Sequence, residues 1–313
     1  MYDETTLDAP LRELTDASLA RPLPAALEHA RAEAIAAARE LLAIPDAALT
    51  RPWTWIGGSN EEVRYGAYRA AEALEQAEIE ARAAVAVTDA GEPRAARIVG
   101  PSTAARWDLH GLLLPLDERL LDADPGGGEW SIRLVLGHVI ASQRGYGWGT
   151  AWWQDRRYDA ADPALPARIP EEFFAAAPDE ATTEAEGTLE DLRVRLDAIL
   201  DLSAERLAGL PDDRLDFGAR WSGFPVTVGF RLGRWSSHLR EHSIQVEKTF
   251  AMLAHVPDEP ARLARHLLAA YGRAESVVFG RQGIDAAVDR VVRGAAEARA
   301  ALTSAREAAG ITG

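Results

Sequence analysis

Long stretches of this chain are built from Ala, Leu, Arg and Glu, and their apolar positions lack the strict alternation expected of strands. These residues are strong helix formers, so the pattern predicts an all-α protein. Breaks rich in glycine and proline divide the chain into eight predicted helices, at about residues 24–42, 60–87, 103–121, 131–154, 189–207, 227–253, 260–279 and 285–309.

The starts and connections of these helices carry further information. The second helix has Ser59 or Asn60 as its predicted N-cap, followed by two glutamates that suit the positive end of the helix dipole. A connection rich in proline and alanine, about 158–184, is too long for a simple bundle turn, and we expect it to pack near a functional rim. The aromatic segment 217–225 is predicted to be irregular.

Helices three to six have the lengths and loops of an antiparallel four-helix bundle. We therefore predict an N-terminal helical extension at 1–98, the bundle at 99–255, and C-terminal helices at 256–313 that pack with the extension. The first two and last two helices either form a second, smaller bundle closed between the chain termini or wrap the first bundle as accessory layers.

The charge and the lack of cysteine narrow the possible functions. The formal net charge of −15 argues against a nucleic-acid partner, which would require a basic face. The absence of cysteine removes disulfides, thiolate ligands and a cysteine nucleophile together. Residues 1–8 are acidic with no apolar signal region, and no apolar run is long enough to span a bilayer. We therefore expect a cytoplasmic protein without a membrane partner.

Three histidines on two predicted helices are the main candidates for chemistry. His238 and His242 are four residues apart, so on a helix both imidazoles leave one face, with about 5–6 Å between their Cβ atoms. His138 lies on another helix of the same bundle and can complete a facial set of ligands. Three protein ligands leave positions open, as in catalytic metal sites. Neutral imidazoles suit zinc, nickel, copper or iron.

A short internal repeat of the His138 segment in the sequence favours a second bundle. Segments 63–69 and 134–140 each follow a tryptophan and share a glycine, Gly66 in one and Gly137 in the other. Ala67 stands where His138 does, so a repeat at this position would be degenerate and would have lost its metal ligand.

Over about residues 100–254 the chain resembles the DinB-like superfamily. The resemblance rests on the segment 128–133 (Gly-Glu-Trp-Ser-Ile-Arg) leading into His138, on the His238/His242 pair, and on the helix order between them. It implies a four-helix bundle whose matching histidines bind a divalent metal, often zinc or nickel. It also implies transfer or rearrangement chemistry with a low-molecular-weight thiol, as in the thiol-dependent S-transferases and mycothiol-dependent maleylpyruvate isomerases. Related bundles often form homodimers.

A mechanism follows from combining this resemblance with the lack of cysteine. A reactive sulfur must come from a small-molecule thiol, which a metal ion would deprotonate for attack on an electrophile. We predict no catalytic residues beyond the metal ligands. A non-catalytic metal-binding protein for stress response or ligand sensing, and a metal-dependent hydrolase, are the alternatives.

Several side chains near the histidines in sequence are candidates for binding substrate. An arginine could hold a carboxylate of the substrate or thiol. Glu241 is better suited to a salt bridge or to supporting a ligand than to acting as a base. For each candidate, an ion-paired helix face or ordinary core packing is the alternative. The candidates are Arg231, Arg234, Ser142, Gln245, Tyr146, Trp148 and Trp152.

Overall fold

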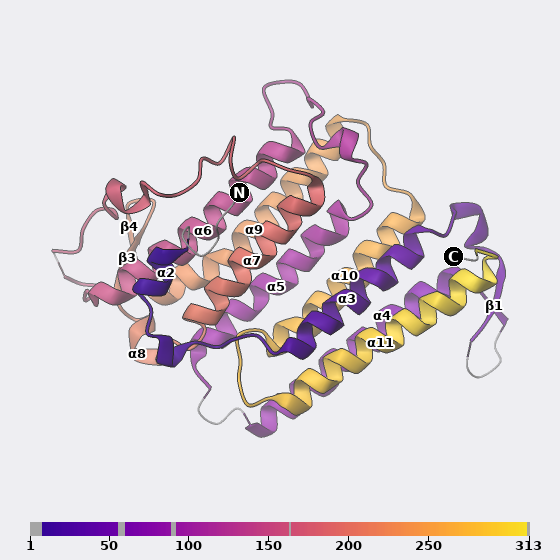
Figure 1. Ribbon diagram of the computed structural model, residues 1–313, viewed down its shortest axis with the longest axis horizontal. Helices are drawn as coiled ribbons and strands as arrows, with labels where there is room; N and C mark the ends of the chain where they lie inside the picture. Colours follow the sequence, from indigo (N-terminus) through magenta and orange to yellow (C-terminus); the bar gives the residue numbers. More distant parts are fainter. Residues whose placement is uncertain (1–7, 56–59, 89–91, 163, 312–313) are drawn as a thin grey trace.

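The computed structural model describes residues 8–55, 60–88, 92–162 and 164–311, and it confirms the all-α class (Figure 1). Two short helices and two hairpins accompany the long helices: α2 (Ala9–Glu13), α8 (Asp212–Leu215), β1 (Pro52–Thr54) with β2 (Asn60–Glu62), and β3 (Gly218–Trp221) with β4 (Phe224–Thr227). The long helices in these ranges are α3 (Ala25–Leu42), α4 (Arg64–Thr88), α5 (Arg94–Leu113), α6 (Ile132–Arg156), α7 (Leu189–Leu207), α9 (Val228–Met252), α10 (Glu259–Val278) and α11 (Asp285–Ala308). None of the described helices is both long and apolar enough to cross a membrane.

Two predicted helix starts are wrong. The helix expected from residue 60 begins at Arg64, because Asn60–Glu62 pairs as a strand with Pro52–Thr54. Asn60 is therefore not an N-cap, and Ser59 lies outside the described residues. The helix expected over 103–121 spans Arg94–Leu113 and continues through Pro101. Its first turns stay helical because their apolar side chains, such as Val99, are buried, and tertiary packing outweighs the lost proline hydrogen bond.

The segment predicted to be irregular, 217–225, instead contributes most of an antiparallel hairpin, β3–β4. Ser222 and Gly223 form its two-residue turn, and both have positive φ, at 46° and 85°. Two successive positive φ values match the twist of a tight hairpin. The Ser-Gly pair between aromatic residues was the sequence signal for this turn.

Helices α5, α6, α7 and α9 form the first bundle, in which α5 and α6 each pack against α7 and α9. Gly137 lies against Ala185, just before α7, and Gly147 lies against Ser203 towards its end, so α6 and α7 are parallel. The bundle thus has two helices in each direction, and the antiparallel prediction does not hold for every neighbouring pair. The reason is the long connection between α6 and α7, which returns the chain to the end where α6 began (Figure 1).

Helices α3, α4, α10 and α11 form a second bundle, as one of the two sequence alternatives proposed. Ion pairs from Arg64 to Glu259 and from Arg273 to Glu75 show that α4 and α10 are parallel. In both bundles the first and fourth helices run one way, and the second and third run the other. The first bundle is therefore inserted between the second and third helices of the second bundle, and the two bundles have the same topology. The division at residues 98 and 255 stays a prediction, and α5 begins before the first of these boundaries.

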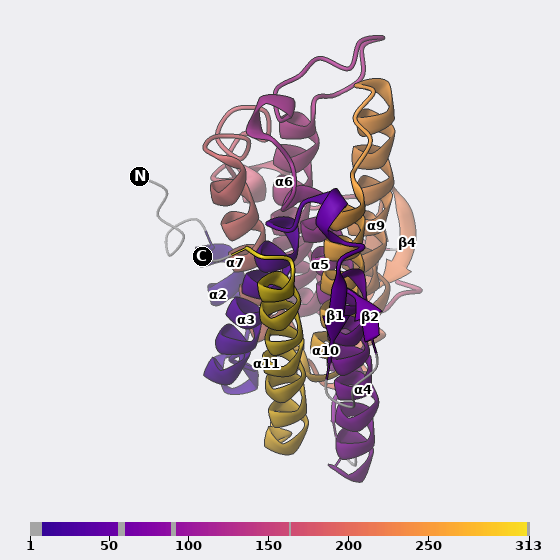
Figure 2. The same ribbon diagram turned by 90° about the vertical axis from the view of Figure 1, so that its right-hand side faces the viewer.

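The two bundles lie side by side and meet where α5 packs along α10 (Figure 2). A buried ion-pair network crosses this junction in both directions. Arg106 of α5 bonds Glu275 of α10 at 2.8 Å, and Arg31 of α3 bonds Asp201 of α7. Burial alone would raise the pKa of the Glu275 carboxyl, but the guanidiniums of Arg31 and Arg106 outweigh it and lower that pKa to about 2. The junction thus holds a buried network of ion pairs, in which opposite charges from both bundles face one another.

Candidate metal centre

Helix α6 presents His138 two turns after a well-capped start. The Ser131 side chain accepts a hydrogen bond from the backbone N–H of Leu134, which satisfies one of the free donors of the first turn. Gly137 precedes the histidine, and a Cβ at this position would collide with the carbonyl oxygen of Glu180. The glycine therefore allows the long α6–α7 connection to lie against the helix beside His138.

Helix α9 presents the other two histidines from a single face. Thr227 caps this helix by accepting from the N–H of Phe230. The Nε2 atoms of His238 and His242 lie 2.9 Å apart, and their ring centroids lie 4.2 Å apart. The four-residue spacing thus places both imidazoles on one face of the helix, as predicted from the sequence.

The three histidines converge between α6 and α9. One ring nitrogen from each can be chosen so that all three atoms lie within 4.8 Å of one another. The His238 side chain is almost fully buried, whereas the His138 side chain is 27% exposed. The site is therefore closed on the α9 side and reachable from solvent on the α6 side.

Outer hydrogen bonds hold two of the rings in the orientation that a metal ligand needs. The Nδ1 atom of His138 lies 3.1 Å from a carboxylate oxygen of Glu180, and Nδ1 of His242 lies 2.7 Å from the amide oxygen of Gln245. Because both acceptors take a proton from Nδ1, each Nε2 keeps its lone pair for a metal. Ser142 approaches Nε2 of His138 at 3.4 Å from the same helix.

The electrostatic environment keeps the α9 pair neutral. Burial, together with the neighbouring His242 and His138, lowers the pKa of His238 to about 3. Burial is also the main cause of the lowered pKa of His242. Neutral imidazole is the form that binds metal, so both residues have the required protonation state at neutral pH.

The donor set fits a divalent metal ion. The two α9 nitrogens lie 2.9 Å apart and the three chosen nitrogens lie within 4.8 Å of one another, close enough that one divalent ion could bind all three imidazoles. Without a metal, these two imidazole nitrogens can form at most one hydrogen bond, in which one of them carries the proton. The buried Nδ1 of His238 also has no hydrogen-bond partner. These features are explained by a bound cation better than by a self-contained hydrogen-bond network.

Two residues of the site were not predicted from the sequence. Glu180 lies 42 positions from His138, and the only signal for it was the length of the connection that carries it. Trp130 was interpreted as a loop-edge residue, yet its ring centroid lies 5.2 Å from that of His138 and it is 39% exposed. It therefore borders the open side of the histidine cluster.

Some of the predicted substrate-binding residues lie at the histidines. Gln245 and Ser142 contact histidine nitrogens, as described above, and the Tyr146 ring centroid lies 5.1 Å from that of His238. Arg234 forms a bidentate ion pair with Glu241, at 2.8 and 3.0 Å. The predicted salt bridge of Glu241 is thus present.

The other candidates lie towards the far end of α6. Trp148 is buried, where its indole N–H donates to Asp8 and its ring stacks on Phe174. Trp152 packs against the ring of Trp153, in the same apolar cluster. Arg231, at the start of α9, is buried near this end as well. The structure does not bring the two tryptophans into contact with the histidines.

Comparison with known protein families agrees with this geometry. Residues 103–246, which run from α5 to late α9 and include all three histidines, match the family model of the DinB superfamily. This part of the chain therefore belongs to the DinB superfamily, as the sequence motifs indicated. No curated protein and no solved structure matches the chain.

Proposed function

We propose that this protein is a metal-dependent transferase that activates a low-molecular-weight thiol at His138, His238 and His242. The observation that carries the proposal is the convergence of three imidazole nitrogens, with no thiolate or carboxylate among them, on a partly exposed side of the bundle. Neutral ligands leave the full charge of a divalent ion available to a further ligand. Zinc or nickel suits the nitrogen donors and the family resemblance.

The protein's own residues would position the reactants. A divalent ion in this site would lower the pKa of a thiol beside it, so that the sulfur is a thiolate near neutral pH. Glu180 and Gln245 hold the two ring protons and so fix the histidine orientations. The thiolate sulfur would then form a bond to an electrophilic carbon, the leaving group on that carbon would depart with its bonding electron pair, and the thiol proton would leave to water. Because the chain has no cysteine, this sulfur belongs to a small-molecule partner. We expect the reaction in the cytoplasm, where such thiols remain reduced.

Metal content is the first test. We expect purified protein to contain about one divalent ion per chain by elemental analysis, and we expect a His138→Ala variant to lose it while keeping its helical circular dichroism. A His266→Ala variant is the matched control, because His266 is exposed on α10, outside the site. Equal metal content in the wild type and the His138→Ala variant would overturn the assignment.

Activity is the second test. The metal-loaded protein is screened with small thiols and an electrophile such as a chloro-dinitroarene, and thioether formation is followed by absorbance. We expect turnover that the His138→Ala variant lacks. Metal binding without turnover of any thiol would support a binding protein, and ester hydrolysis without added thiol would support a hydrolase.

A further inference from the structure

Arg231, in the first turn of α9, is a buried cation that no carboxylate of the described residues neutralises, although its guanidinium lies 5.8 Å from the centre of the Trp221 ring. The residue is only 8% exposed. Its Nη1 donates to the backbone carbonyl of Arg220 at 2.7 Å, and its buried Nε has no partner. Within the described part of the chain, no carboxylate lies at ion-pair distance from it. Arg234, one turn later, differs because Glu241 neutralises it.

Burying a guanidinium without a counter-charge costs free energy, and an arginine does not avoid this cost by losing its proton. Burial lowers the pKa of Arg231 to about 10, which still leaves it cationic at neutral pH. Proteins usually pair such a charge or replace it with an apolar side chain. A buried arginine without a carboxylate partner is therefore a place where an anion from solution would be stabilised.

The arginine lines a cavity of about 270 Å³ at the end of the first bundle. Arg220 also lines the cavity, and its side chain donates to the backbone carbonyls of Leu165, Pro166 and Gly223. On α6, a Cβ at Gly149 would collide with Nη2 of Arg231, so the glycine makes room for the guanidinium. Apolar side chains line the cavity as well, namely Trp153, Ile169 and Phe174.

We propose that this cavity binds a small organic acid, with its carboxylate on Arg231 and its apolar or aromatic body against Trp153, Ile169 and Phe174. The planar guanidinium can donate two parallel hydrogen bonds to a carboxylate, and Arg220 adds a second positive charge. Arg231 lies seven residues before His238, about 10 Å along the helix axis. The proposal does not depend on the metal centre, since no histidine of that centre lines the cavity.

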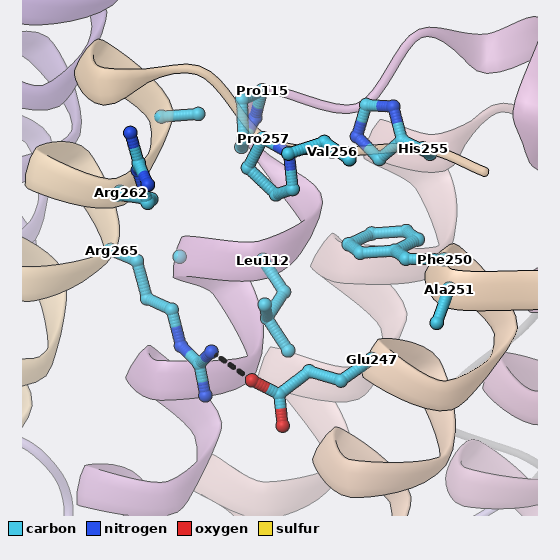
Figure 3. A pocket seen from close by; sticks show the side chains of 12 residues that line it. Leu112, Pro115, Glu247, Phe250, Ala251, His255, Val256, Pro257, Arg262 and Arg265 are labelled. Carbon is cyan, nitrogen blue, oxygen red and sulfur yellow. Dashed lines mark hydrogen bonds and ion pairs between the residues drawn. The ribbon is translucent and has the colours of Figure 1, made fainter.

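A second cavity, between α5, α9 and α10, shows the contrast (Figure 3). It is larger, about 370 Å³, and is lined by apolar residues such as Leu112 and Phe250. Its Arg265, however, is paired with both Glu247 and Asp108. Carboxylates of the protein thus already neutralise this arginine, so volume alone does not single out a site for an anion.

The test uses benzoate as the probe and benzamide, its neutral isostere, as the control ligand. We expect calorimetry to show that benzoate binds at least about tenfold more tightly than benzamide, because only the carboxylate pairs with the guanidinium. We also expect benzoate to raise the melting temperature at constant ionic strength. Equal binding of the two ligands, or an equal thermal shift with sodium chloride, would overturn the proposal.

Variants separate a ligand-binding role from a structural one. Arg231→Gln should lose benzoate binding by about tenfold or more, while its ligand-free melting temperature stays unchanged or rises because a bare buried charge is removed. Gly149→Ala should weaken benzoate binding with the charge retained, because it displaces the guanidinium. Arg240→Gln, an exposed arginine on the same helix, is the control. A lower melting temperature of Arg231→Gln with unchanged benzoate affinity would show a structural arginine and overturn the proposal.

Discussion

The two bundles of this protein share a topology and differ in what they bury between their second and fourth helices. In the first bundle, α6 and α9 bring together His138, His238 and His242. In the second, α4 carries Ala67 at the position that the internal repeat aligns with His138, and Gly66 packs against Ala305 of α11. The space between α6 and α9 is therefore polar and partly exposed, whereas α4 and α11 pack closely through glycine and alanine. The comparison shows that the helix arrangement provides positions, and that side chains decide whether those positions become a site.

The largest expected effect tests the first bundle directly. His238→Ala removes the most buried of the three ligands, and we expect metal affinity to fall by on the order of a thousandfold, since each ligand contributes several kcal/mol. Competition with a metal-sensitive dye measures the loss. Ala67→His in the second bundle is the counterpart, and it should add no metal because no facing histidine pair exists on α11. Metal gained by the Ala67→His variant would refute the difference between the bundles.

The next prediction tests whether the bundles are independent. Arg106 belongs to the first bundle and is fully buried against Glu275 of the second. Arg106→Met leaves that carboxylate with only Arg31 as a charged partner, so we expect a loss of about 3–5 kcal/mol in the free energy of unfolding. Urea titration followed by circular dichroism measures it. Full stability in the variant would show that the Arg106–Glu275 ion pair does not stabilise the junction between the bundles.

The same junction predicts a pH dependence. Because the Arg31 and Arg106 guanidiniums outweigh burial, the folded-state pKa of Glu275 is about 2, below its ordinary value of 4.5. A lowered folded pKa stabilises the fold above pH 4.5, and this contribution is lost as the pH falls towards 2. The difference corresponds to about 3 kcal/mol. Unfolding curves between pH 6 and pH 2 should therefore fall less steeply for Glu275→Gln than for the wild type, and parallel curves would contradict this origin.

The sequence predicted the elements that depend on local pattern. Helix-forming composition and the breaks rich in glycine and proline located α6 and α9, and the four-residue spacing placed His238 and His242 on one face. What it could not predict depends on contacts distant in the chain. Glu180 reaches His138 because a connection folds back over Gly137. Arg231 is buried at a place where no carboxylate of the described residues lies at ion-pair distance, which local sequence does not reveal. The start of α5 was missed because burial of its first turns overrides the proline signal.

The smallest expected effect comes from comparing alanine substitutions at two glycines, Gly66 and Gly137, that the internal repeat aligns. Both are crowded, since a Cβ at Gly66 would collide with Ala305 and a Cβ at Gly137 would collide with the carbonyl oxygen of Glu180. Each alanine substitution should lower the free energy of unfolding by about 1–3 kcal/mol through overpacking. Only Gly137→Ala should also weaken metal binding, by about tenfold, because it displaces the carboxylate that orients His138. Stability and metal affinity are measured on both variants. If Gly66→Ala weakened metal binding as much as Gly137→Ala, the effect would arise from general loosening of the fold, and the role of Glu180 in orienting the histidine would be wrong.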